Sequence, residues 1–174
     1  MFRKDGTDMQ ENKQEQVRRE IRMLAGCEME EALALVWEGF SDFQAQDCSE
    51  ETIDEFWSAI DQEYMIQQYG DGIVRFWGAF EDDFLVGVCA IREMRRVELM
   101  YVDGQYHRLG IGTSLLKKAV MDTKEIALDM DRLYVNASPY SVPFFEAMGF
   151  KPTGPVEEEG GLKYQPMMIQ GLWV

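Results

Sequence analysis

Apolar side chains recur along this chain at two spacings, and each spacing predicts one type of element. From Glu28 to Phe43 they return every three or four residues, which predicts a helix with one buried side. Ser49 then begins a second helix, because its hydroxyl can cap the first turn and the acids after it favour a helix N-terminus. The apolar positions are Ala32, Leu35, Val36, Phe40 and Phe43 in the first helix and Ile53, Phe56, Trp57 and Ile60 in the second.

Shorter alternating or continuous apolar runs predict the strands. The expected strands are Gln16–Leu24, Arg75–Phe80, Phe84–Arg92, Val97–Val102, Arg132–Val135 and about Lys163–Gln170. Two more helices are expected, one holding Leu115–Val120 and one over Ser138–Met148 that Gly149 closes. There is no internal repeat and no linker. This order therefore predicts a single α/β domain over residues 15–174, after a flexible tail at residues 1–14.

One strand-to-helix junction carries the strongest chemical signal, the run V-E-L-M-Y-V-D-G-Q-Y-H-R-L-G-I-G-T-S-L-L-K-K from Val97 to Lys118. Gly110 and Gly112 have no side chain to keep a ligand away from the backbone, and the helix that follows starts with unbonded N–H groups. Arg108 adds a forked cation suited to phosphate oxygens. The junction predicts a site for a phosphate-bearing ligand; the alternative is a tight turn with only a structural role.

This loop resembles the acyl-CoA signature of the GNAT superfamily of N-acetyltransferases, R/Q-x-x-G-x-G/A. The run L-Y-V-N-A-S-P-Y-S-V-P-F-F-E-A-M-G-F from Leu133 to Phe150 resembles a second feature of that superfamily, an Asn at a strand end, an aromatic pair in a helix and a closing G-F. The resemblance covers roughly residues 17–170. It implies a mixed, mostly antiparallel central sheet flanked by helices, splayed between the strands at Val97–Val102 and Arg132–Val135.

The same resemblance implies acetyl-CoA as the cofactor, with its pantetheine arm entering the split between those two strands. The residues it implies at the cofactor are Met100, Tyr101, Val102, His107, Arg108, Leu109, Gly110, Ile111, Gly112, Thr113, Asn136 and Phe145. His107, the only histidine, stands where the family usually has Gln or Arg. Two interpretations stay open for it, packing and hydrogen bonding through the loop, or direct contact with a phosphate.

Acetyl transfer to an amine requires a base for the amine and benefits from an acid for the leaving thiolate. In many family members the proposed acid is a Tyr four residues before the G-F glycine, where this chain has Phe145. Tyr140, one turn earlier, is the expected substitute. Tyr101 and Tyr134 are weaker candidates, and protonation by solvent is a further alternative.

Glu98 is the expected base, since strand alternation places it on one face with Met100 and Val102 and an acid on this strand commonly serves as base in the family. A plain ion pair between Glu98 and Arg95 or Arg96 is the alternative. Water leading to one of the acids between residues 28 and 83 would serve as well.

Charge is placed unevenly along the chain. The segment 28–83 holds 16 acidic residues and one basic residue, which accounts for the whole net charge of −15. By the resemblance, its two helices line the acceptor side of the cleft, and Asp42, Asp47, Glu50 and Glu51 flank the loop between them. We therefore expect a cationic small-molecule amine as acceptor, ahead of a basic peptide; the alternative is a solvated acidic surface. Nucleic acid is disfavoured as a partner because it requires a basic face.

The expected activity is thus N-acetyl transfer from acetyl-CoA to a primary amine. An acyl-CoA-binding sensor without catalysis is the alternative, and an interaction protein without a CoA site a third. No apolar run approaches the ~20 residues of a membrane span, and the N-terminal residues lack a signal-peptide core, so a cytoplasmic location is expected. One histidine and three scattered cysteines predict neither a metal site nor a disulfide framework. The protein is expected to be a monomer or homodimer.

Overall fold

The computed structural model describes residues 17–173, so the tail expected at residues 1–14 lies outside the described residues. The helices are α1 (Met29–Phe43), α2 (Glu50–Ala59), α3 (Gln62–Gly70), α4 (Ile111–Ile126) and α5 (Val142–Ala147). The strands are β1 (Arg19–Met23), β2 (Val74–Glu81), β3 (Phe84–Arg92), β4 (Arg96–Val102), β5 (Arg132–Ala137), β6 (Lys151–Pro152), β7 (Glu157–Glu159) and β8 (Leu162–Gln170).

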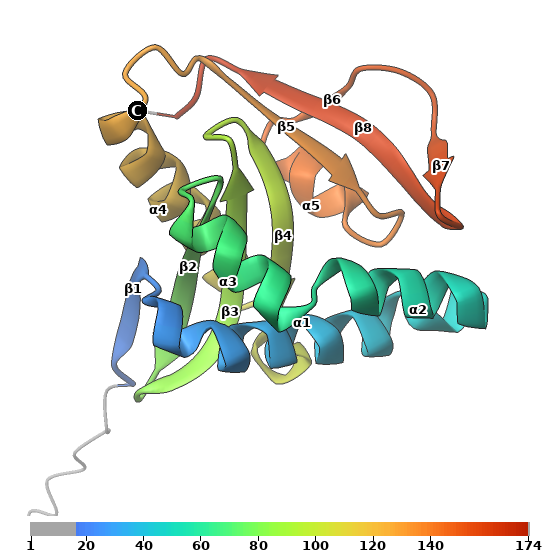
Figure 1. Cartoon of the computed structure of the whole chain (residues 1–174). Coiled ribbons are helices and arrows are strands. Elements are labelled where there is room, and N and C mark those ends of the chain that lie inside the picture. The colour runs from blue at the N-terminus through green and yellow to red at the C-terminus, as the bar shows by residue number, and fades with distance from the viewer. Residues whose placement is uncertain (1–16, 174) are drawn as a thin grey trace, which may run out of the picture.

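The strands form one mixed sheet in the order β1-β2-β3-β4-β5-β8-β6, and β7 pairs with β8 (Figure 1). All neighbours are antiparallel except β4 and β5, which run parallel. The mostly antiparallel sheet predicted by the sequence is therefore confirmed.

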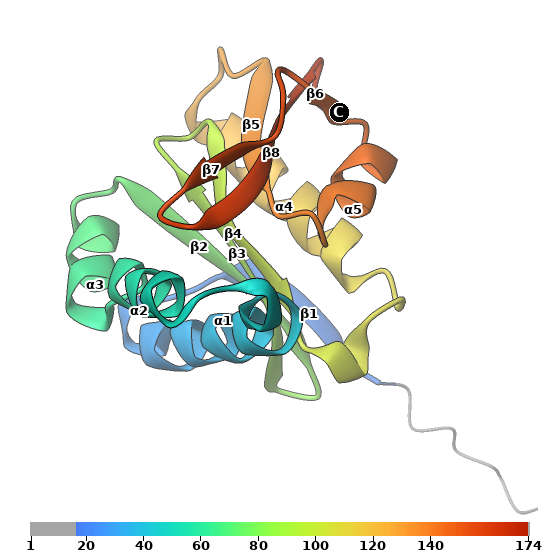
Figure 2. The ribbon, with the colours of Figure 1, turned by 90° about the vertical axis from the view of Figure 1, so that its right-hand side faces the viewer.

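Each face of the sheet has its own apolar core. Helices α1 and α3 cover one face, where Phe40, Met65 and Phe76 are buried. Helices α4 and α5 cover the other, over Trp77, Leu115 and other buried side chains. Figure 2 shows α1, α2 and α3 on one side of the sheet and α4 with α5 on the opposite side. Burying apolar surface on both faces is what fixes the helices to the sheet.

Strands β4 and β5 part soon after they meet. Their Cα partners are Arg96 with Tyr134 and Val97 with Val135, and beyond these pairs β4 stays with β3 while β5 stays with β8 (Figure 1). The predicted splay of the sheet is thus confirmed. It leaves the edge of β4 from residue 98 onward without a strand partner on the β5 side.

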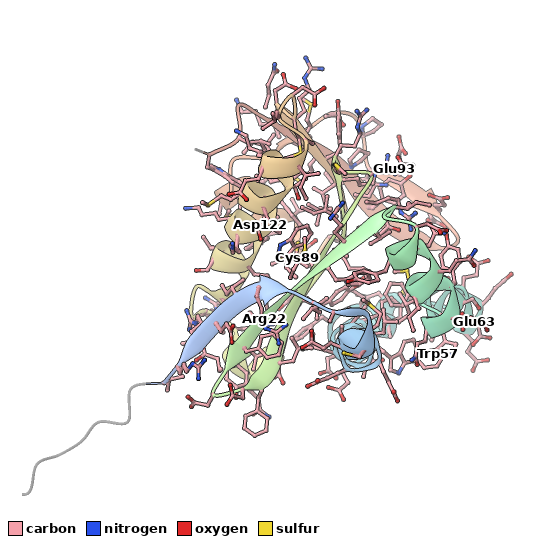
Figure 3. The ribbon with its side chains drawn as sticks, turned by 60° about the vertical axis from the view of Figure 1, so that its left-hand side comes forward. Arg22, Trp57, Glu63, Cys89, Glu93 and Asp122 are labelled. Carbon is pink, nitrogen blue, oxygen red and sulfur yellow. The ribbon has the colours of Figure 1, made fainter. Side chains whose placement is uncertain are left out.

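Asp122 of α4, labelled in Figure 3, connects this helix to the sheet. Its carboxylate accepts from Trp77 Nε1 of β2 at 2.9 Å and from Lys118 Nζ one turn earlier at 2.6 Å. This contact orients the helix whose N-terminus forms the candidate phosphate loop. None of the helices within residues 17–173 combines the length and apolar character needed to cross a membrane.

Candidate functional site

The loop before α4 contains two residues in the left-handed backbone conformation, which glycine adopts readily and other residues adopt rarely. Gly110, which begins the helix, has φ +74°, and Arg108 has φ +62°, also in the left-handed region. The first helical bond runs from the Ser114 N–H to the Gly110 carbonyl at 3.1 Å. The N–H groups of residues 111–113 therefore have no partner within the helix, and this end carries partial positive charge.

Gly112 brings this helix end against the split. A Cβ at Gly112 would lie 3.2 Å from the Phe144 ring and 3.4 Å from the Met100 methyl group. Met100 belongs to β4 and Phe144 to α5, so the first turn of α4 sits where these two elements meet. The first turn of α4 is in this way next to the open edge of β4.

His107 is engaged within the protein. Its Nε2 donates to the Val102 carbonyl at 2.6 Å, and its ring stacks on Phe43 with centroids 4.9 Å apart. The structure therefore shows the packing interpretation of this residue. Arg108, Leu109 and Gly110 are exposed, whereas His107 is half-buried, so Arg108 is the more accessible of the two side chains.

A bulge corrects the expected orientation of Glu98. Leu99 pairs with Ala90 and Val97 with Ile91, so Glu98 is an extra residue between two pairs, and strict alternation fails there. Glu98 Oε1 lies 3.1 Å from Arg92 Nε, and Arg92 also donates to Gln68 of α3 at 3.0 Å. Glu98 therefore faces the α3 side, whereas Met100 and Val102 pack toward α4. Its ion-pair partner is Arg92, not Arg95 or Arg96.

Tyr101 lies on the α1 side of β4. Its ring packs where a Cβ of Gly39 would stand, and Gln44 Nε2 donates to its hydroxyl at 3.2 Å. Burial raises the pKa of the Tyr101 hydroxyl to about 12, so it stays protonated at neutral pH. The side chain is therefore a neutral donor close to the end of α1.

Tyr140 borders a cavity of about 400 Å³ on the α1 side of the split. Its ring stacks on Phe43 with centroids 5.0 Å apart, while 55% of the residue remains exposed. The cavity is lined by Phe43, Gln44, Asp47, Cys48, Ser138, Pro139, Tyr140, Gly161, Leu162 and Lys163. Desolvation and the neighbouring Asp47 raise the pKa of the Cys48 thiol, so it remains a neutral lining group. The proposed acid thus sits at a space large enough for a small amine.

Phe145 and Asn136 have different placements. Phe145 is 1% exposed and packs edge-to-face with Phe150 at 5.2 Å, so the structure does not place its ring where a cofactor could touch it. Phe144 is the member of the pair that faces Gly112. Asn136 is exposed on β5, just beyond the last residue paired with β4.

The acidic residues near the α1–α2 loop do not gather in one place. Asp47 lines the 400 Å³ cavity, but Asp42 lines a separate cavity of about 300 Å³ with Glu38 and Asp103. Glu50 and Glu51 lie in the exposed first turn of α2. Within residues 17–173 no cluster of potential metal ligands occurs.

Sequence reasoning missed three parts of this site. The turn between β7 and β8 reaches the cavity through Gly161 and Leu162, and it rests on α2 at Thr52. Gln44 binds Tyr101, and Arg19 of β1 donates to the Leu109 carbonyl at 3.3 Å. These contacts join residues far apart in the chain, so no local sequence pattern predicts them.

Taken together, the described residues offer a helix end with unbonded N–H groups, an open strand edge and a cavity bordered by a phenol. A profile of the acetyltransferase (GNAT) domain matches residues 44–170. A search of curated proteins finds no match.

Solved structures share the fold. PaiA N-acetyltransferase from Thermoplasma acidophilum, in complex with coenzyme A, is 22% identical with a TM-score of 0.73 over 88% of this chain and 99% of that one. A GCN5-related N-acetyltransferase from Rhodopseudomonas palustris is 21% identical with a TM-score of 0.72 over 87% and 94%. A mutant of spermidine N-acetyltransferase SpeG from Vibrio cholerae is 18% identical with a TM-score of 0.62 over 88% and 94%.

Proposed function

This chain belongs to the GNAT family of acetyltransferases, and from that premise we propose that it transfers an acetyl group from acetyl-CoA to the primary amine of a cationic small molecule. The observation that carries the proposal is the position of the α4 N-terminus. Its first turn lies at Gly112 beside the open edge of β4, Arg108 stands in the loop just before it, and the cavity bordered by Tyr140 lies on the α1 side.

The loop residues fit the phosphates of acetyl-CoA. The N–H groups of residues 111–113 and the exposed Arg108 supply donors and positive charge. Gly110 and Gly112 keep side chains away from these donors, and His107 supports the loop from inside. The edge of β4 at Met100, Tyr101 and Val102, with Asn136 opposite, would hold the extended arm through backbone groups.

Acetyl-CoA, when bound, supplies a thioester whose acetyl carbon is attacked by the amine nitrogen while CoA leaves as the thiol. We assign Tyr140 to donate a proton to the leaving sulfur, because its hydroxyl is on an exposed ring at the cavity. Glu98 is the proposed base. Since its carboxylate is paired with Arg92 on the α3 side, it would take the amine proton through intervening water rather than directly.

The acceptor is proposed to be cationic because Asp47 lines the cavity and the elements on this side of the sheet carry the chain's excess acid. Spermidine acetyltransferase shares the fold, which is consistent with this acceptor class. Lys163 at the same cavity disfavours a second cation near β8, so the amine is expected near Asp47.

Release of thiol from acetyl-CoA tests the proposal with three amines of equal carbon chain, a diamine, a monoamine and an amino acid. We expect kcat/KM to be highest for the diamine, since it adds a cation at fixed length. Equal values for all three would contradict a cationic acceptor while leaving the acetyltransferase intact.

Tyr140→Phe tests whether Tyr140 donates the proton to the leaving sulfur. Glu98→Gln tests whether Glu98 accepts the proton of the amine. Each is expected to lower kcat by about a hundredfold, the low end for general acid–base groups. Tyr164→Phe and Glu93→Gln are matched controls, because Tyr164 binds Glu157 at an exposed edge and Glu93 is exposed in a turn (Figure 3). An unchanged kcat in Tyr140→Phe would show that Tyr140 is not the acid and that solvent protonates the leaving thiolate.

A sensor that binds acyl-CoA without transfer remains the second candidate. The observation that favours it is Phe145, which occupies the place of the usual acid and is buried. Tight CoA binding with no thiol release for a wide range of amines would support the sensor and exclude the transferase.

A further inference from the structure

The N-terminal strand reaches the phosphate loop through one side chain. Arg19 of β1 stands opposite Glu81 of β2, and the two side chains form an ion pair through Arg19 Nε and Glu81 Oε1. Nη1 of the same guanidinium donates to the Leu109 carbonyl at 3.3 Å. Residues separated by 90 positions in the chain are thereby joined at the loop that precedes α4.

Glu81 is placed to hold this guanidinium still. It is 5% exposed, whereas Arg19 lies at the surface, so a buried carboxylate lies beneath an exposed guanidinium. A buried carboxylate needs a partner, and Arg19 is the cation that pairs with it in the described residues. The planar guanidinium then points its remaining donors in set directions.

The bond from Arg19 to the Leu109 carbonyl also orients the N–H of Gly110, which belongs to the same peptide group. In a planar trans peptide the carbonyl and the N–H point in opposite directions. Because the Leu109 carbonyl is held toward β1, the N–H of Gly110 is directed away from β1. That N–H belongs to the donors at the start of α4.

The loop also needs such a restraint. Arg108 is a non-glycine residue at φ +62°, and Gly110 follows at φ +74°. A left-handed conformation at a residue with a side chain costs free energy and persists only where the surroundings determine it. Of the described residues outside the loop and its helix, Arg19 is the one whose side chain bonds the backbone of residues 108–110.

We propose that Arg19 is a positioning residue for the acyl-CoA phosphate site: by bonding Glu81 through Nε and the Leu109 carbonyl through Nη1, it sets the loop so that its amides face the phosphates. The inference rests on the proposed function, since it concerns the same cofactor. It assigns Arg19 no contact with the reacting atoms.

Arg19→Lys is the decisive variant. Lysine keeps the charge that Glu81 needs, but its ammonium lacks the flat fork that serves both partners at once. We expect the Kd for CoA by calorimetry and the KM for acetyl-CoA to rise about tenfold, as for loss of one charge-assisted hydrogen bond, with kcat within about twofold. A Kd equal to that of the unmodified chain would overturn the proposal, since charge alone would then suffice.

Arg18→Gln is the matched control. Arg18 precedes Arg19, is exposed, and bonds Asp82 through its backbone, so the substitution removes a cation from the same edge without touching the loop. It is expected to leave the Kd for CoA unchanged. A tenfold loss in this control would show that general charge at β1, not the Arg19 geometry, attracts CoA, and would overturn the proposal.

Glu81→Gln combined with Arg19→Lys tests the chain of contacts. If Glu81 acts on CoA only through Arg19, the double variant should bind CoA no more weakly than Arg19→Lys alone. Additive losses would contradict that route. Failure of the unmodified chain to bind CoA would refute the proposed function itself, whereas normal CoA binding by Arg19→Lys would refute only the role of Arg19.

Discussion

Phe145 shows how one position can resemble a site in sequence and belong to the core in space. Its place before the G-F pair matches that of a proposed acid in related acetyltransferases. In the structure the ring is 1% exposed and packs between Phe144 and Phe150 at 5.1 and 5.2 Å. Adjacent helical residues point about 100° apart, so Phe144 rather than Phe145 reaches Gly112.

Phe145→Tyr is therefore expected to destabilise the protein without raising turnover. The added hydroxyl would enter a packed apolar cluster, at a cost of about 1–3 kcal/mol in the free energy of unfolding. Urea denaturation measures that cost, and thiol release measures turnover. Phe144→Tyr is the control for stability, since Phe144 is only half-buried. A rise in kcat for Phe145→Tyr would show that this ring reaches the sulfur after all.

At the level of elements, the hairpin of β7 and β8 supplies one wall of the 400 Å³ cavity, opposite the end of α1 and the loop after β5. Its turn has Gly160 at φ +56° and Gly161 at φ +77°, and a Cβ at Gly161 would collide with the Thr52 hydroxyl of α2. Thr52 is itself buried and bonded to Ser49, the residue that caps α2. The hairpin therefore contacts the capped first turn of α2. This close approach is possible because Gly161 has no side chain.

Gly161→Ala is expected to push the turn away from α2. The positive φ alone costs on the order of 1 kcal/mol, and the collision displaces the cavity wall formed by residues 161–163. The KM for the amine should rise several-fold while the KM for acetyl-CoA stays constant, because the phosphate loop is elsewhere. Gly154→Ala, which meets no atom within 4 Å, is the matched control. Equal changes in both KM values would contradict a local effect on the acceptor.

Element prediction was most accurate where a local pattern coincides with burial. Most of the expected stripe of α1 is buried, and Ser49 caps α2 by accepting from the Thr52 N–H, as predicted. The stripe expected on the second helix is not buried as a whole, because Ile53 and Phe56 are half-buried and Trp57 is 56% exposed. Helix α3 and the short strands β6 and β7 were missed, since 62–70 lacks a clear apolar stripe and residues 151–159 are exposed. Helix α5 begins later than expected, because Ser138 and Ser141 form a hydrogen-bonded turn before it.

Over the whole molecule, charge is divided between the two faces of the sheet. Segment 28–83, with its 16 acids and one base, forms α1, α2, α3 and β2 on one side (Figure 2). On the opposite side, Arg108 stands in the loop just before α4, and the helix itself carries Lys117 and Lys118. This charge distribution would draw the proposed cationic acceptor and the anionic acetyl-CoA toward different faces of the sheet.

The dependence of kcat/KM on salt concentration should show whether long-range electrostatic attraction contributes to binding of the amine. Raising NaCl from about 0.05 to about 0.5 M shortens the Debye length several-fold, so kcat/KM for a diamine should fall more steeply than for a monoamine. Steady-state thiol release at each salt concentration measures both slopes. Parallel slopes would indicate that the acidic face only maintains solubility.

By itself the sequence determined the glycine loop before α4, the order of most strands and helices, and the excess of acid on one segment. These features are local, because capping, glycine freedom and apolar periodicity act over a few residues. Only the tertiary structure decided which face each side chain takes. The bulge turned Glu98 toward Arg92, burial removed Phe145 from the split, and Arg19 met Leu109. Such contacts depend on strand register and helix docking, which are set by packing across the whole sheet.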